Sequence, residues 1–291
     1  MTAIILRRRK LGRGSAKGIA QFSTKGIRQV RNWVESIPTN TEVVFRWGCT
    51  SNMPLPNGSF GATPLVINTA AAIHWCSDKR QGRLDMQAAG VPVPRTWGTW
   101  IEMIGDKSDD PSDMKVVLRP SKHAQGRNLF VFSWEQGELA GKCRQLDGYY
   151  ISELIDKVEE YRVFVCQNRA VWVAKKTPGN PDDVAWNVAR GGRFDNVRWN
   201  DWPMQVIKAA LAAAKVSGTD FCGVDVMVDA EGKPYVLEVN SAPSQTSEYR
   251  QQCVAKVFDY IIEYGKDHFP DVSDGPRKTY KSYIHPALRE G

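Results

Sequence analysis

Short apolar runs recur along the chain between clusters of glycine, proline and polar residues. Many of these runs are rich in β-branched or aromatic residues, a pattern that predicts buried strands. They occupy residues 41–47, 64–68, 115–119, 129–132, 149–155, 160–166, 169–175, 223–229 and 234–240. The third and fourth runs, and likewise the last two, are separated by polar turns that contain glycine, so each of these pairs is expected to form a hairpin.

Other segments have helical spacing or are rich in alanine. They predict helices at residues 69–75, 78–89, 205–217 and 249–264. Asp78 is suited to cap the second helix and Gly90 to end it. The Val-Pro-Val-Pro sequence at 91–94 is then extended, because each proline excludes the helical region for the residue before it, and it suggests a boundary between lobes. Residues 273–291 are polar, basic and interrupted by proline, which predicts a mobile tail or an arm packed on the surface.

Composition narrows the class of protein. With 291 residues, 42% of them apolar and 24% charged, the chain is long enough for two or three compact lobes. No apolar window is long enough to span a bilayer and the N-terminus lacks a secretory pattern, so we expect a cytoplasmic protein without membrane contact. The six cysteines have no metal or redox spacing, which indicates free, buried thiols.

Positive charge is concentrated at the two ends of the chain. The net charge is +7, and basic residues cluster between Arg7 and Lys17 and again between Arg277 and Lys281. Such ends favour anionic partners, which include nucleic acid, nucleotide or an acidic substrate. The alternative is a solvated basic surface. The sequence leaves a homo-oligomer open.

The most informative segment is the last predicted hairpin, which carries three oxygen-bearing side chains. Alternate residues of a strand share a face, so Glu238 and Asn240 point the same way and Asp225 of the partner strand can join them. Leu237 and Val239 are then expected to point into the core. Two carboxylates and one amide oxygen form a hard site that suits Mg²⁺, with Mn²⁺ as a substitute. A hairpin with exposed acids is the alternative.

Several cations lie near predicted strand ends. Arg119 and Lys122 flank a loop containing Gly126, whose backbone N–H groups can hold phosphate oxygens, although a hairpin with basic tips is also ordinary. Arg162 lies in an apolar strand and needs a partner or an anion, and Glu159 or Glu160 could supply an ion pair.

A third group of cations follows. It comprises Lys175 and Lys176 and the segment from Asn187 through Arg190 to the glycine pair Gly191-Gly192. A surface loop explains this segment equally well.

Taken in order, these segments resemble the ATP-grasp superfamily and, within it, the RimK-like ATP-dependent carboxylate–amine ligases. The similarity covers roughly residues 78–247. Its motifs are Asp78-Lys79, the sequence at 90–96, Leu118-Arg119-Pro120, Glu153-Leu154-Ile155, Glu160-Tyr161-Arg162, Asn187 with Arg190-Gly191-Gly192, Gly223-Val224-Asp225 and the sequence at 237–243. The last motif is specific, whereas the glycine loop at 121–126 is degenerate.

The resemblance implies a fold of mixed α/β and α+β type. Two α+β lobes of the ATP-grasp fold would hold ATP between them, preceded by a small N-terminal α/β lobe. The implied limits are 1–77 for an N-terminal substrate lobe, 78–152 for a central lobe with the phosphate loop, 153–270 for a C-terminal lobe with the magnesium site, and 271–291 for a basic tail.

The resemblance also implies roles for single residues. Asp225, Glu238 and Asn240 would hold magnesium ions that bridge the ATP phosphates. The nucleotide set would be Lys79, Arg119, Ser121, Gly126, Glu153, Leu154, Ile155 and Glu160, with Glu153 and Leu154 at the adenine and Glu160 at the ribose. The γ-phosphate and an acyl phosphate would be surrounded by Arg162, Lys175, Asn187 and Arg190.

Two features depart from the family pattern. Arg119 stands where the family usually has lysine, and arginine is bulkier and more demanding in geometry. The phosphate loop has the single glycine Gly126. In the N-terminal lobe, Arg46 is a candidate for binding a substrate carboxylate or else a surface cation beside a core tryptophan, and Asn68 is a second substrate candidate.

The expected function is an ATP-dependent carboxylate–amine ligase that acts through an acyl phosphate and releases ADP and phosphate. Small molecules or peptides would supply the carboxylate and the amine. Two alternatives remain. The basic ends suggest a ligase with a macromolecular acceptor, such as a protein tail or nucleic acid, and the departures at Arg119 and its loop suggest an ATP-binding scaffold with impaired catalysis.

Overall fold

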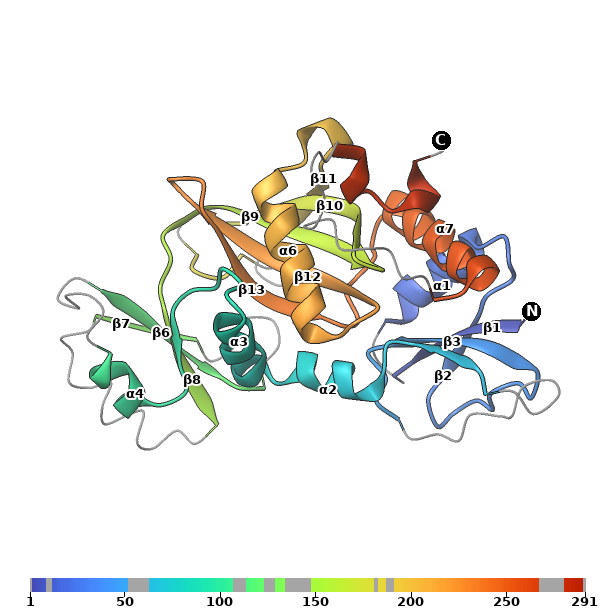
Figure 1. Ribbon diagram of the computed structural model, residues 1–291, viewed down its shortest axis with the longest axis horizontal. Helices are drawn as coiled ribbons and strands as arrows, with labels where there is room; N and C mark the ends of the chain where they lie inside the picture. Colours follow the sequence, from blue (N-terminus) through green and yellow to red (C-terminus); the bar gives the residue numbers. More distant parts are fainter. Residues whose placement is uncertain are drawn as a thin grey trace.

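Three β-sheets organise the computed structural model of the protein (Figure 1). The structure describes residues 2–8, 12–51, 63–106, 114–122, 129–133, 148–180, 183–186, 191–266 and 280–289. Gly126, Asn187 and Arg190 lie outside these ranges, as do Cys143 and most of residues 271–291. Of the helices described, none is both long and apolar enough to cross a bilayer.

The first sheet is parallel, with strand order β2-β1-β3-β4. Its strands are β1 (Thr2–Arg7), β2 (Arg28–Arg31), β3 (Thr41–Trp47) and β4 (Leu65–Ile67). The sequence predicts β3 and β4 but misses β1, β2 and the helix α1 (Arg13–Phe22). Strand β1 is buried on both faces and so shows no alternation. Helix α1 buries Ser15, Ala16 and Gly18 together with a single larger residue, Ile19, which gives no apolar stripe.

The second sheet is antiparallel, with order β5-β8-β6-β7. Its strands are β5 (Thr96–Trp97), β6 (Lys115–Pro120), β7 (Phe130–Ser133) and β8 (Tyr149–Glu153). The hairpin of β6 and β7 confirms the prediction. Three helices belong to this part of the chain, α2 (Ala70–Ser77), α3 (Lys79–Ala88) and α4 (Trp100–Gly105). The Asp78 side chain accepts a hydrogen bond from the Gln81 N–H and caps α3, as expected.

The third sheet is antiparallel, with order β11-β10-β9-β12-β13. Its strands are β9 (Lys157–Cys166), β10 (Arg169–Thr177), β11 (Arg193–Asn196), β12 (Phe221–Asp229) and β13 (Pro234–Asn240). Helix α6 (Met204–Ser217) lies across one face, where Val224, Val226 and Val236 are fully buried (Figure 1). The short 3₁₀ turn η3 (Trp199–Asp201) leads into this helix.

The opposite face of the third sheet is aromatic at one end. Phe164 stacks on Trp172 with ring centres 5.6 Å apart, and Phe221 packs against Trp47 of β3 at 5.3 Å. Phe258 of helix α7 (Glu248–Tyr264) lies 5.2 Å from Phe221. This cluster joins the core of the first sheet to that of the third, so the two sheets share one hydrophobic core. The lobe limits given by the resemblance stay a prediction.

The C-terminal segment packs on this core. Its turn η5 (Pro286–Leu288) lies beside α7 and follows the turn η4 (Tyr280–Tyr283) (Figure 1). Ile284 bridges to Ala170 of β10, and the fully buried His285 bonds Gln167 at 2.8 Å. Burial lowers the pKa of His285 to about 3. Of the two predicted alternatives, the packed arm is therefore correct for residues 280–289, and the mobile tail is wrong for them.

The described cysteines have no disulfide partners. Cys49, Cys76, Cys166, Cys222 and Cys253 are all buried and free, as the sequence predicts. Burial raises the pKa of Cys76 to about 12 and that of Cys253 to about 11, so both thiols stay protonated near neutral pH.

Asn68 also joins the first sheet to the third. Its fully buried amide donates from Nδ2 to the Phe221 carbonyl at 2.9 Å, and Oδ1 accepts from the N–H groups of Asp220 at 2.7 Å and Phe221 at 3.1 Å. Its φ of 66° is a conformation that asparagine tolerates better than most residues. Asn68 therefore has a structural role in place of the predicted contact with substrate.

We expect Asn68→Ala to lower the free energy of unfolding by about 3 kcal/mol, because three buried main-chain groups lose a partner. Chemical denaturation measures this loss. Asn168→Ala is the matched control, because Asn168 has a similar φ of 58° but an exposed side chain. The control should lose only the ~1 kcal/mol that a left-handed conformation costs alanine. Equal losses in the two variants would contradict the bonding role.

Candidate nucleotide and metal site

A cleft in two parts lies between the second and third sheets. One part has a volume of about 600 Å³ and the other about 720 Å³. Both are lined by Arg119, Lys157, Val184, Trp186, Met227 and Leu237. Because they share these walls, the two cavities form one continuous cleft, large enough for a small ligand with a polar end.

The first part of the cleft contains the predicted adenine residues. Glu153, Leu154 and Ile155 line it at the end of β8. The Leu154 N–H donates to the Lys115 carbonyl at 2.8 Å, and the Glu153 N–H donates to the Arg95 carbonyl at 2.8 Å. These two amide donors brace the wall, so neither is available to a base.

Leu237 lines both parts of the cleft, which corrects the prediction that it points into the core. The register of β12 and β13 pairs Asp225 with Glu238 but Val226 with Val236, which leaves Leu237 as an extra residue. Such a bulge breaks the strict alternation on which the prediction depends. Val239, beyond the bulge, is buried as expected.

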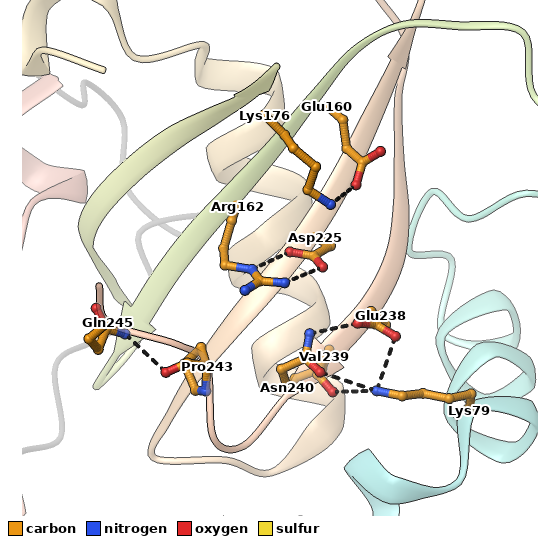
Figure 2. A network of polar contacts seen from close by, with 10 residues as sticks. All are labelled: Lys79, Glu160, Arg162, Lys176, Asp225, Glu238, Val239, Asn240, Pro243 and Gln245. Carbon is orange, nitrogen blue, oxygen red and sulfur yellow. Dashed lines mark hydrogen bonds and ion pairs between the residues drawn. The ribbon is translucent and has the colours of Figure 1, made fainter. Parts of the chain in front are cut away.

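The aromatic face of the third sheet becomes charged where it reaches the cleft. Arg162 of β9 lies opposite Asp225 of β12 and donates from Nε to Oδ1 at 2.6 Å and from Nη2 to Oδ2 at 2.7 Å (Figure 2). Burial acts to lower the pKa of Arg162, but the Asp225 charge outweighs it and raises this pKa above its ordinary value. The sequence suggests Glu159 or Glu160 as the ion-pair partner of Arg162. The partner is instead Asp225, which lies on the neighbouring strand.

Glu160 forms the centre of a second charged group. Its side chain is buried and pairs with Lys176, as Figure 2 shows. It also pairs with Lys157 at 2.5 Å. Two cations on one carboxylate leave a net positive charge at the wall of the cleft, where an anionic ligand would be stabilised. Burial lowers the pKa of Lys157, while Glu160 opposes that effect.

Lys175 lies on the other face of the sheet. It pairs with Glu159 beside Tyr161 of β9, and its side chain is 45% exposed. The sequence predicts that Lys175 lies near Arg162, but the structure places the two side chains on opposite faces of the sheet. The neighbouring Lys176 lines the cleft instead.

The three predicted metal ligands converge at the second part of the cleft. Asp225 and Glu238 are cross-strand neighbours, and Asn240 donates from Nδ2 to Glu238 Oε1 at 2.8 Å. Lys79 of α3 lies 3.3 Å from Glu238 Oε2 and 3.4 Å from Asn240 Oδ1 (Figure 2).

The donor set fits a hard divalent cation. Its oxygen atoms already attract the cationic groups of Arg162 and Lys79, and Mg²⁺ needs few protein ligands. No group of three or more His, Cys, Asp or Glu side chains is placed to hold a metal in the described ranges, so such an ion would need oxygen atoms from a ligand or from water as well.

The remaining predicted residues divide between the cleft and the scaffold. Arg119 lines both parts, and its buried Nε has no hydrogen-bond partner in the described structure. Ser121 does not line the cleft; its carbonyl accepts from the Lys79 N–H at 2.8 Å and so supports the start of α3. Arg46 donates from Nη1 to the Ser51 carbonyl at 3.0 Å and braces a turn after β3.

Sequence reasoning missed several residues of the cleft. Lys157 lies before the predicted start of its strand, which begins three residues earlier than expected. Trp186 lies in a loop without a recognisable motif, and its ring contacts the Lys157 ammonium at 4.5 Å. Phe194 lies on a short edge strand that has little apolar character. A predicted strand that began at Lys157 would have included this residue. No local pattern distinguishes Trp186 or Phe194.

Gly223 lies two residues before Asp225 on β12, where the packing requires a glycine. A Cβ at this position would lie 2.6 Å from Pro243 Cβ, so only glycine allows the loop after β13 to pack against β12. Ser244 of that loop lines the cleft. The position of this wall of the cleft therefore depends on Gly223 having no side chain.

We expect Gly223→Ala to lower the free energy of unfolding by about 1–3 kcal/mol, because the added methyl group overpacks the contact with Pro243. Gly14→Ala is the control, since no atom lies within 4 Å of a Cβ built on this residue of α1. It should be neutral or stabilise the protein by up to about 1 kcal/mol. Thermal or chemical unfolding of both variants decides the point, and a Gly223→Ala protein as stable as wild type contradicts it.

Comparison with known proteins agrees with this geometry. The RimK-like ATP-grasp domain matches residues 115–263, just over half of the chain. The chain therefore belongs to the RimK-like ATP-grasp family and is a ligase of the type that forms C–N bonds. It is similar to a probable alpha-L-glutamate ligase of Stenotrophomonas maltophilia (strain K279a), with 28% identity over 210 residues that cover 68% of each chain.

Solved structures share the fold. One is the ATP-grasp ligase PsnB complexed with a phosphomimetic variant of its minimal precursor, Mg and ADP. Its TM-score is 0.61 at 12% identity, over 91% of this chain and 99% of that one. Another is the D-alanine–D-alanine ligase from Bacillus anthracis complexed with ATP, with a TM-score of 0.59 at 15% identity, over 91% of this chain and 96% of that one. These similarities confirm the predicted ATP-grasp fold.

Proposed function

We propose that the protein uses ATP to phosphorylate a carboxylate and then joins the acyl group to an amine, releasing ADP and phosphate. A substrate carboxylate oxygen attacks the γ-phosphorus and ADP leaves. The amine then attacks the carbonyl carbon of the acyl phosphate, phosphate leaves and the amine loses a proton. The observation that supports this most directly is the convergence of Asp225, Glu238 and Asn240 beside Arg162 in one cleft.

In this proposal the two parts of the cleft hold different parts of ATP. The first part, with Leu154 and Met227 among its walls, takes the adenine, and the second takes the phosphates. Arg119 lines both parts, and its Nε has no hydrogen-bond partner among the described residues, which suits a residue that contacts the phosphate chain. Lys157 and Lys176 both pair with Glu160 in the second part, and the excess of one positive charge favours the phosphates there.

Mg²⁺ at Asp225, Glu238 and Asn240 would neutralise charge on the phosphates when bound. Arg162 and Lys176 face the same space and would stabilise the negative charge that develops during transfer. No side-chain nucleophile is needed for this chemistry, because positioning and charge stabilisation are sufficient. Asn187 and Arg190, the other members of the predicted catalytic set, lie outside the described residues.

The substrates belong to the class of amino acids or peptides. The S. maltophilia relative is named for alpha-L-glutamate, and the PsnB structure contains a precursor. We propose an amino acid as one partner of the reaction, with a small molecule or peptide as the other. Location in the cytoplasm and assembly as a homo-oligomer, which the sequence leaves open, stay predictions.

The function is tested by release of ADP in the presence of ATP, Mg²⁺ and pairs of amino acids or peptides. Glu238→Gln keeps the shape of the side chain but removes its charge. We expect it to lower the maximal rate about 100-fold or more, because an electrostatic contact with the reacting phosphates is lost. Equal turnover by Glu238→Gln and wild type would remove Glu238 from the site, and no turnover of any carboxylate by wild type would remove the proposed reaction.

The two adjacent lysines give an internally controlled test. Lys176→Met should lower the maximal rate of ADP release by about 100-fold, because Lys176 faces the phosphates in the proposed complex. Lys175→Met should change it less than about fivefold, since an exposed ion pair is worth at most about 1 kcal/mol. A larger effect at Lys175 than at Lys176 would show that the proposal assigns the wrong face of β10.

A further inference from the structure

An aromatic ring lies among the cations of the cleft. Phe194 of β11 is paired in register with Lys176 of β10, and its half-buried side chain lines the cleft. The centre of its ring is 4.8 Å from the Arg162 guanidinium carbon and 5.3 Å from the Lys176 ammonium. Both distances are within the range at which a cation is attracted to the face of an aromatic ring.

Arg250 of α7 fixes the strand that carries this ring. The buried Arg250 side chain donates from Nη2 to the Phe194 carbonyl at 2.9 Å and from Nε to Asn196 Oδ1 at 2.7 Å. Its guanidinium also lies 5.1 Å from the centre of the Trp172 ring. Because β11 is an edge strand that pairs with β10 alone among the described strands, these contacts supply the support that a second neighbouring strand would give.

The ring lies among three like charges. The Arg250 guanidinium is 5.7 Å from the Phe194 centre, so Arg162, Lys176 and Arg250 all contact the same side chain. Burial lowers the pKa of Arg250, and the nearby positive charge of Arg162 lowers it further. An electron-rich ring face offsets part of this repulsion, whereas an aliphatic side chain of similar size would not.

We propose that Phe194 is a positioning residue of the ligase site, whose ring holds the Arg162 guanidinium against Asp225 and the Lys176 ammonium toward the cleft, with Arg250 holding the ring. The proposal rests on the function above, in which Arg162 and Lys176 stabilise the transferred phosphoryl group. Figure 2 shows these two side chains side by side, each directed at its carboxylate. Long, flexible side chains need such support, because a displacement of about 1 Å can cost ~100-fold in rate.

The test compares Phe194→Leu with Phe194→Tyr, which keeps the ring. Phe22→Leu is the matched control, because it makes the same exchange at a half-buried phenylalanine at the end of α1. We expect Phe194→Leu to lower kcat for ADP release by about 10- to 100-fold with little change in KM for ATP, because positioning during transfer is lost. Phe194→Tyr and Phe22→Leu should stay near the wild-type kcat.

If Phe194 only stabilises the fold, a different result is expected. Phe194→Leu would then lose thermal stability and ATP affinity together, and Phe194→Tyr would not restore kcat. That outcome, or an unchanged kcat in Phe194→Leu, overturns the proposal. Arg250→Met should lower kcat as Phe194→Leu does, and the double variant should fall little further, since both changes release the same contact. Fully additive losses overturn the part assigned to Arg250.

A spectroscopic measurement separates this inference from the proposed reaction. The NMR signal of the Arg162 Nε–H is assigned by its loss in Arg162→Lys. The ring-current effect of Phe194 should change the chemical shift of this proton. Phe194→Leu should therefore move the signal, and Phe194→Tyr should largely preserve its position. An unmoved signal in Phe194→Leu overturns the inference even if the enzyme is active. If wild type phosphorylates no carboxylate, the reaction proposal fails, and the NMR signal still decides the position of Arg162.

Discussion

The site depends on the pleat of the third sheet, which places alternate residues of β9, β10 and β12 on one face. That face is aromatic where it meets the first sheet and charged where it meets the cleft. Phe164 and Arg162 are two residues apart on β9, and Phe221 and Asp225 are four apart on β12. The aromatic packing against Trp47 and Phe258 therefore fixes β9 and β12, the strands that carry Arg162 and Asp225 further along the same face.

Charge compensation then determines how the elements meet. Arg162 joins β9 to β12 through Asp225, Lys176 joins β10 to β9 through Glu160, and Lys79 joins α3 to β13 through Glu238. A buried charge without a partner would be costly, and each of these three acids is matched to a cation from another element. The cations that neutralise these acids are those that a phosphate chain would also attract, which ties the stability of the cleft to its proposed chemistry.

Two local features shape the cleft of this chain. The bulge at Leu237 places an apolar side chain in the wall of both cavities without moving Glu238 from the face that it shares with Asp225. Arg119 extends along the boundary of the two cavities, where a shorter or more compact cation would contact less of the cleft. Both features concern the shape of the cleft, and neither alters the order of strands that supports it.

The sequence by itself determined the elements with regular patterns and the chemistry that depends on them. Alternation in the last hairpin placed Asp225, Glu238 and Asn240 together, because faces within a strand follow from spacing alone. It failed where spacing carries no information. Buried on both faces, β1 shows no alternation, and α1 packs through small residues.

Only the tertiary structure decided which of two adjacent residues meets the cleft. Lys175 and Lys176 are indistinguishable in sequence, yet the pairing of β10 with β9 and β11 sends them to opposite faces. The partner of Arg162 lies 63 residues away and is fixed by strand register, not by proximity along the chain. The bulge at Leu237 and the support of Phe194 by Arg250 likewise arise from contacts between elements, which local patterns of polarity do not encode.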